Sequence, residues 1–194
     1  DKVPEGFIFA VKGSRFITHM KKLKDPRPSL KLLFERASAL KEKLGPVLFQ
    51  LPPGWDLNLP RFHDFLDALP KKRRFTFELR NPTWFTDEVF QALADHGASL
   101  CVYQIAGRSS PVLATADFVY VRLHGPTGAA YQGSYSDADL RIWAARIGGW
   151  LRENRDVFVY FDNDQMAYAA QDADRLRRMV GVPLKSKSPQ PQRV

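Results

Sequence analysis

Charged side chains stand at the ends of short hydrophobic runs in this sequence. Glu78 and Arg80 close one such run, and Lys12 closes another. Arg122 and His124 close a third, alternating with aliphatic residues. Alternate side chains of a β-strand point to the same face of the sheet. The pattern therefore predicts a polar face at the carboxyl ends of three strands.

These residue types suit acid–base chemistry on an anion. Carboxylates and imidazoles transfer protons, so we predict Glu78 and His124 as the catalytic acid and base. Lys12, Arg80 and Arg122 would hold an anionic group of the substrate. One alternative stays open: Glu78 and Arg80 form only a buried ion pair that balances Arg122, because buried charges need partners in any fold.

Further polar or aromatic residues follow the same strand ends. Trp84 either stacks on a substrate ring or covers the next helix, and Asp164 is equally readable as a helix N-cap. Residues 125–136 are rich in Gly and Tyr and resemble a lid-like loop. We predict that these residues contact the substrate: Gln50, Trp84, Tyr131, Tyr160, Asn163 and Asp164.

Other kinds of site have little support in the sequence. No pair of histidines has the HExxH spacing of a zinc enzyme, although a metal on Glu78 and His124 is an alternative. Ser14, Ser99 and Cys101 lack a nucleophile motif, and glycine-rich phosphate loops are absent. We therefore predict no metal and leave any cofactor unknown.

Strand and helix patterns alternate along the chain. The predicted strands cover 7–12, 46–51, 74–80, 98–103, 118–124 and 156–162. The predicted helices cover 29–44, 59–69, 86–96, 137–151 and 165–180. Ser29, Thr86 and Ser136 are expected N-caps, and Gly45 and Gly97 expected C-terminal glycines. This alternation predicts βαβ units and a parallel sheet covered by helices.

A polar strand face also selects among parallel-sheet architectures. An open sheet with helices on both faces would bury these charges against helices. A TIM-type (β/α) barrel instead directs apolar residues to the helices and polar residues to its interior and carboxyl mouth. We therefore predict an α/β barrel with its site at that mouth.

Composition limits the class of protein. The chain has 194 residues, 44% of them hydrophobic, and no apolar run near the ~20 residues of a membrane-spanning helix. A single cysteine excludes an internal disulfide framework, and we expect a cytoplasmic protein. We expect one domain over residues 1–180 and a flexible basic tail over 181–194. The first residue is not Met, so we expect the chain to begin inside a longer one.

The net charge of +8 is unevenly distributed. Basic residues gather before residue 44, at Lys71–Arg74 and in the tail. Such patches are usually solvated, but they also bind polyanions. An alternative function is therefore nucleic-acid binding through Lys21, Lys22, Lys24 and Lys71–Arg74.

Several segments closely resemble the YecE-like family, also called domain of unknown function 72. The resemblance extends to about Val180 and rests on these segments: residues 9–12, 15–19, 48–53, 77–84, 120–125 and 160–164. It implies a TIM-barrel fold with the site at the mouth. The family usually has about two more N-terminal βα units, with motifs that are missing here, so the resemblance implies an incomplete barrel. Asp162 and Gln104 depart from its usual residues.

The resemblance implies no reaction, because the activity of the family is not established. From the residues we predict an enzyme that acts on a phosphorylated or otherwise anionic small molecule. The reaction would be hydrolysis or proton transfer at the carboxyl mouth. Dependence on Glu78 would favour this enzyme, whereas steep salt dependence would favour nucleic-acid binding.

Overall fold

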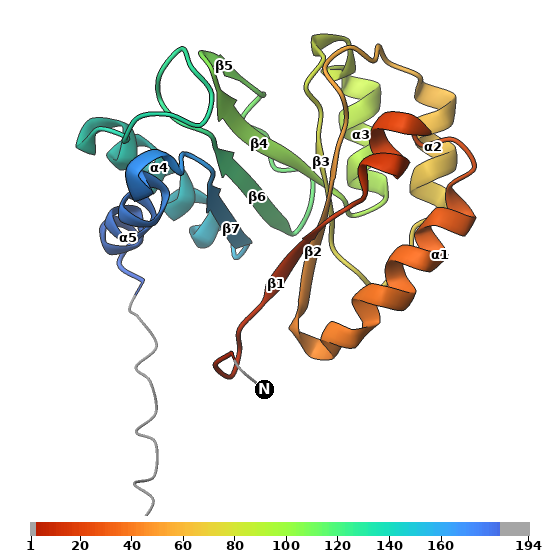
Figure 1. Ribbon diagram of the computed structural model, residues 1–194, viewed down its shortest axis with the longest axis horizontal. Coiled ribbons are helices and arrows are strands. Elements are labelled where there is room, and N and C mark those ends of the chain that lie inside the picture. Colours follow the sequence, from red (N-terminus) through yellow and green to blue (C-terminus); the bar gives the residue numbers. More distant parts are fainter. Residues whose placement is uncertain (1–2, 183–194) are drawn as a thin grey trace, which may run out of the picture.

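The sheet is parallel and curls into a half-barrel (Figure 1). The structure, a computed structural model, describes residues 3–182. A short strand β5 (Arg108–Ser109) pairs antiparallel with β4. The six parallel strands follow one another in the order β1 (Phe9–Lys12), β2 (Leu44–Gln50), β3 (Phe75–Glu78), β4 (Ser99–Ile105), β6 (Phe118–Leu123) and β7 (Asp156–Phe161). The α/β class, the parallel sheet and all six expected strands are confirmed.

Helices connect the parallel strands and lie outside the curved sheet (Figure 1). The α-helices are α1 (Pro26–Ala37), α2 (Leu59–Asp67), α3 (Asp87–Asp95), α4 (Asp137–Arg152) and α5 (Tyr168–Val180). Short helical turns are η1 (Phe16–Met20), η2 (Ser38–Lys43), η3 (Pro82–Trp84) and η4 (Gln165–Ala167). The five expected helices are present, with shifted ends at α1 and α5.

Local chemistry explains where several helices begin. The side chain of Thr86 accepts from the amide of Val89, and Ser136 forms a capping box with Asp139, so both expected N-caps are confirmed. Ser29 is not a cap, because α1 already begins at Pro26, a residue suited to the first helical position.

The expected C-terminal glycines give one success and one correction. Gly97 has φ +60 just beyond α3, as a left-handed C′ residue should. Gly45 instead lies inside β2, because the helix before it ends early and η2 leads into the strand. The expectation for Gly45 was therefore wrong.

The two faces of the sheet carry separate hydrophobic clusters. On the helix-covered side, Phe49, Phe77 and Leu100 belong to one cluster, and Val119 and Val121 to a second. A third cluster consists of residues of opposite strand parity: Leu48, Cys101, Tyr103, Ala116, Phe118 and Tyr120. These residues mark the concave face, on which the polar strand ends also lie.

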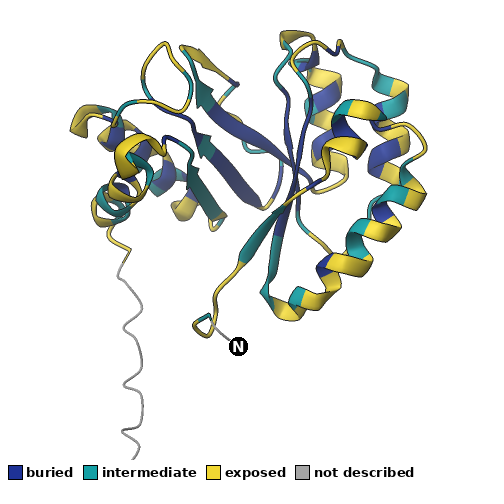
Figure 2. Cartoon of the chain, in the orientation of Figure 1, coloured by how far each residue is buried: buried dark blue, intermediate teal, exposed yellow. Residues whose placement is uncertain are grey.

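The described sheet path ends at β1 and β7, which do not pair with each other. Both edge strands are only partly buried, whereas β3 is buried throughout (Figure 2). The described residues therefore form an open half-barrel rather than a closed barrel.

Two expectations concern the ends and surroundings of the chain. Within residues 3–182, no helix combines the length and apolarity needed to cross a membrane. The expected tail, 181–194, lies almost entirely outside the described residues, since the description stops at residue 182.

Candidate functional site

Strand register brings the predicted polar residues to one edge of the sheet. Gln50 lies beside Glu78 in the β2–β3 pair, and Arg122 lies beside Tyr160 in the β6–β7 pair. Because these strands are parallel, their carboxyl ends meet at the same edge. Strand alternation therefore predicted the face correctly.

Glu78 is the centre of the cluster and is fully buried. Its Oε1 accepts from Nε of Arg80 at 2.5 Å, and its Oε2 accepts from Arg122 at 2.5 Å. Burial alone would raise the pKa of Glu78, but the two guanidinium groups outweigh it and lower that pKa. Glu78 is therefore an ionised carboxylate whose two oxygens are already occupied.

Arg122 holds a second carboxylate, that of Asp162. The distance from the second terminal nitrogen of Arg122 to Oδ2 of Asp162 is 2.9 Å. Sequence reasoning noted Asp162 only as a departure from the family pattern and did not select it as a site residue. Asp162 lies two residues after Tyr160, so strand alternation places both on the same face. This spacing could have identified Asp162 from the sequence.

His124 lies between the two carboxylates and is fully buried. Its Nδ1 is 3.3 Å from Oδ2 of Asp162, and its Nε2 is 3.9 Å from Oε1 of Glu78. Neither ring nitrogen makes a hydrogen bond within the described residues. Burial is the main cause that lowers the pKa of His124 to about 4, and nearby Arg122 and Arg80 lower it further against the pull of Glu78. The imidazole is therefore neutral at pH 7.

Lys12 approaches the cluster from the edge strand β1. Its Nζ donates to Oε1 of Gln50 at 2.9 Å, and it makes no ion pair with any carboxylate of the described chain. Burial, followed by repulsion from Arg122, lowers the pKa of Lys12. Three cationic residues thus face two carboxylates in the cluster, so one positive charge is in excess.

Two tyrosines flank this cluster. Tyr131, in the loop after β6, donates its backbone N–H to the carbonyl of His124 at 2.6 Å. Its ring lies edge-on to the imidazole, with a centroid distance of 5.5 Å. Tyr160 stacks on Tyr120 at 5.0 Å on the concave face. Both predicted tyrosines therefore lie near His124 or on the same face of the sheet.

Two predicted substrate contacts have another place in the structure. Trp84 is fully buried on the helix side, where its indole N–H donates to the carbonyl of Trp55 at 2.8 Å. The turn η3 directs Trp84 away from the mouth and into the hydrophobic cluster under the helices. This supports the alternative in which Trp84 packs against a helix. Asn163 is also fully buried, and its side chain donates to the carbonyl of Gly133 and to Asp172. It holds a loop, and its predicted contact with a substrate stays a prediction.

Asp164 is exposed, and its side chain makes no capping bond to η4. Asp164 does occupy the N-cap position of η4, as the alternative expected, but without a side-chain cap. Its predicted contact with a substrate stays a prediction.

A buried aspartate that the sequence analysis missed fixes the loop over the site. Asp172 of α5 accepts hydrogen bonds from Ser134, from the backbone N–H of Tyr135 and from Asn163. Arg175 also pairs with it at 2.8 Å. An acid within a predicted amphipathic helix resembles an exposed charge, so no sequence signal distinguished it.

Neither of two hollows, of about 770 and 760 Å³, includes the cluster around Glu78. Within residues 3–182, no group of three or more His, Cys, Asp or Glu side chains is arranged to hold a metal ion. The cluster is a compact network of charges, with the ring of Tyr131 against His124.

Comparison with known proteins identifies relatives of the chain. The family model described as protein of unknown function DUF72 matches residues 1–193. This match gives no support to the expectation that an N-terminal part of the family domain is missing. No curated protein matches.

Solved structures of DUF72 family proteins share the fold. One from Thermotoga maritima is 24% identical over 93% of this chain and 76% of its own, with a TM-score of 0.82. Two structures of a DUF72 family protein from Enterococcus faecalis, 18% and 20% identical, have TM-scores of 0.79; they cover 96% and 93% of this chain, and 79% and 81% of their own chains. At these identities the likeness supports the fold alone.

Proposed function

The chain belongs to the DUF72 family of proteins of unknown function, and we propose that it is an enzyme that acts on a phosphorylated or otherwise anionic small molecule. The reaction is hydrolysis or proton transfer at the carboxyl edge of the half-barrel. The observation that carries this proposal is a neutral buried imidazole whose ring nitrogens make no hydrogen bond within residues 3–182, beside a charge cluster with one positive charge in excess.

His124 is the proton acceptor in this proposal. A general base must be unprotonated at the working pH, and His124 meets this condition because its pKa is lowered to about 4. The proton comes from the attacking water in hydrolysis and from the substrate itself in proton transfer. Asp162, 3.3 Å from Nδ1, would stabilise the imidazolium that forms.

Glu78 positions other residues in this proposal and does not transfer a proton, although a carboxylate could do so. Both of its oxygens already bind arginines, so it is poorly placed to accept a further proton. Its carboxylate holds Arg80 and Arg122 in fixed positions. Glu78 is therefore a positioning residue in this proposal.

The anionic group of the substrate is held by the cationic side of the cluster. Of the three cationic residues in the cluster, Lys12 alone has no carboxylate partner among residues 3–182, and it is exposed. Arg80 and Arg122 offer their remaining N–H groups. Charge-assisted hydrogen bonds of this kind contribute about 1.5–3 kcal/mol each. Movement of the loop that carries Tyr131 would admit the substrate to His124.

Calorimetric titration with inorganic phosphate tests the anion site. We expect Lys12→Gln to weaken phosphate binding roughly tenfold, in line with the loss of one such bond. Lys22→Gln, which removes an equal charge from a partly exposed residue outside the cluster, serves as the matched control. Equal affinities of the parent and Lys12→Gln would refute the anion site.

The base is tested with a chromogenic phosphate ester such as p-nitrophenyl phosphate. We expect His124→Gln to lower turnover by about 10²–10⁴-fold, the usual contribution of a general base. Thermal melts of the variant establish that it is folded. A folded His124→Gln protein with unchanged turnover would exclude His124 as the base.

The TIM-type barrel and the cytoplasmic location belong to the same proposal. Parallel strands, helices on one face and polar residues at the carboxyl ends on the other support a TIM-type architecture. The single described cysteine, Cys101, is free and buried, which suits a reducing compartment. A crystal structure would test the architecture, and fractionation of cells would test the location.

A further inference from the structure

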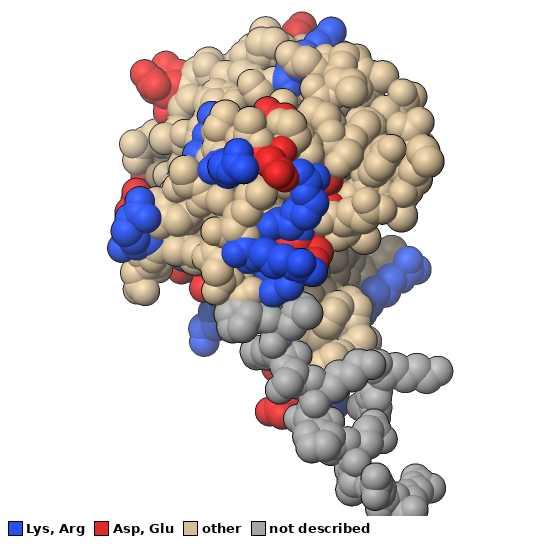
Figure 3. All heavy atoms as spheres, turned by 90° about the vertical axis from the view of Figure 1, so that its left-hand side faces the viewer, with Lys and Arg blue, Asp and Glu red and all other residues tan. Residues whose placement is uncertain are grey.

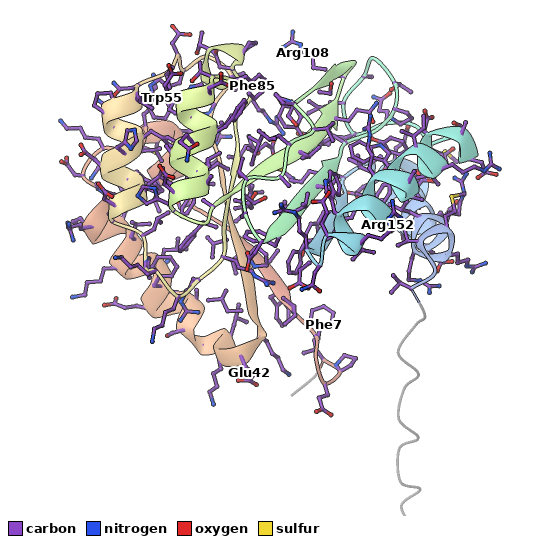
Figure 4. All side chains as sticks on the ribbon, turned by 180° about the vertical axis from the view of Figure 1, so that it is seen from behind. Phe7, Glu42, Trp55, Phe85, Arg108 and Arg152 are labelled. Atoms are coloured by element: carbon purple, nitrogen blue, oxygen red, sulfur yellow. The ribbon has the colours of Figure 1, made fainter. Side chains whose placement is uncertain are left out.

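A hollow of about 760 Å³ lies at the amino ends of the strands. Its walls come from the start of β2, the loop before β3, the end of α3 and the loop before β6. In Figure 4, Phe7 and Glu42 mark this end of the molecule, while Phe85 and Arg108 lie at the other. The hollow is therefore separate from the cluster around Glu78.

Three consecutive cations line this hollow without carboxylate partners. Lys71, Lys72 and Arg73 are exposed, and none of them makes an ion pair within residues 3–182. Like charges so close together repel each other, and no acid of the described structure forms an ion pair with any of the three. A bound anion would relieve it.

The neighbouring Arg74 fixes the segment in place. Its guanidinium pairs with Asp156 at 2.7 Å and lies over the rings of Phe118 and Phe158 at 5.3 and 5.8 Å. Its backbone carbonyl accepts from the amide of Val47 at 2.9 Å. The three cations thus directly precede an anchored strand start, which reduces the entropy lost when a ligand orders them.

His96 also lines this hollow, and its hydrogen bonds favour the protonated imidazole. Its Nδ1 is 2.8 Å from the carbonyl of Ala92, and its Nε2 is 3.0 Å from Oδ1 of Asp67. Both ring nitrogens face oxygen acceptors, and only the protonated imidazole donates at both. Burial lowers the pKa of His96, but these hydrogen bonds outweigh it and raise that pKa. Among the acids, Asp117 also lines the hollow.

The basic residues of α5 are arranged differently. Figure 3 shows the side of the molecule that carries α4 and α5, where basic side chains adjoin acidic ones. Arg177 and Arg178 both pair with Asp174, and Arg175 pairs with Asp137. The cations of residues 71–73 have no such partners in the described structure, and all three are consecutive and line one hollow.

We propose that this hollow is a second binding site, which takes a small molecule carrying a chain of two or three phosphates. The volume of the hollow falls within the roughly 300–1,000 Å³ typical of small-molecule sites. Closely spaced phosphates match three adjacent cations better than a single phosphate does. Ile8 and Phe158 supply an apolar wall for the uncharged part of the ligand.

Titration with inorganic triphosphate, with inorganic phosphate as the comparison, tests this site. We expect Lys71→Gln/Lys72→Gln to weaken triphosphate binding roughly tenfold, since two partly solvated contacts are lost. Lys21→Gln/Lys22→Gln removes the same charge outside the hollow and should change affinity less than about twofold. In NMR titrations, amide shifts should gather at residues 71–74, 96–97 and 115–117.

Three outcomes would overturn the site. The first is a parent protein that does not bind triphosphate. The second is an equal loss of affinity in both double variants, which would indicate general surface charge. The third is tight, strongly salt-dependent binding of a single-stranded oligonucleotide without triphosphate binding, which would favour the nucleic-acid alternative. Lys12→Gln should leave the shifts at residues 71–74 unchanged, so this test is independent of the proposed reaction at His124.

Discussion

Replacing Arg122 by Met should destabilise the protein through Glu78. The variant keeps the apolar stem of the side chain but leaves a fully buried carboxylate with Arg80 as its sole close guanidinium in the described structure. Removing one partner of a buried pair costs about 3–5 kcal/mol. For a domain of this size, such a loss lowers Tm by roughly 6–20 °C. Urea denaturation at pH 7 measures the free energy of unfolding directly.

The pH dependence of this cost identifies its cause. In the parent, the pKa of Glu78 is lowered by folding, so its contribution to stability is present above the ordinary value of 4.5 and is lost as pH falls through the folded value. In Arg122→Met, burial is opposed by Arg80 alone, and the carboxyl protonates more readily. The difference in unfolding free energy between parent and variant should therefore be smaller at pH 5 than at pH 7.

A double variant separates this effect from lost packing. Glu78→Gln/Arg122→Met should be more stable than Arg122→Met alone, because a buried amide needs no counter-charge. Asp162→Asn removes the other carboxylate of Arg122 and should cost less, since Asp162 is 29% exposed and Glu78 stays paired. An Arg122→Met protein within about 1 kcal/mol of the parent at pH 7 would refute the reasoning.

Three further predictions follow from the described contacts. In histidine-selective NMR, His124 should titrate near pH 4 and His96 above 6.5. Because folding lowers the pKa of His124, its contribution to stability should be lost as the pH falls from 6.5 toward 4. Titration of His124 near 6.5 would mean that its ring is hydrated. Gly125→Ala should lower Tm more than Gly107→Ala. A Cβ added at Gly125 would lie 2.3 Å from the carbonyl oxygen of Gln132, whereas a Cβ added at Gly107 would have no neighbour within 4 Å. Equal changes in Tm would contradict this. Asp172→Asn should speed hydrogen exchange at the backbone amide of Tyr135, which donates a 2.9 Å hydrogen bond to the Asp172 carboxylate. Unchanged exchange would show that other contacts hold the loop.

Local rules predicted one part of this site and missed another. The period of two in strands fixed the face of Glu78 and Arg122, because side-chain direction in a strand depends on the backbone alone. Trp84 follows its strand through a helical turn, where that rule no longer holds. Asp172 reaches its partners from another helix, and such a contact depends on how distant elements pack. The charge state of His124 likewise depends on burial among residues far apart in sequence.

The order of strands in the sheet bears on how the chain folds. The parallel strands are arranged in space as they are along the chain, so each new strand adds beside the one made before it. Because only successive parallel strands pair, the loop-closure cost is smaller than in a sheet whose connections skip strands, although each parallel pair still spans a helical connection. On the ribosome, each strand would emerge with its partner already present, and the sheet would grow outward from β1 with no gap kept for a later strand. Every intermediate would then expose two unpaired edges, one at β1 and one at the newest strand, and the next strand covers only the second.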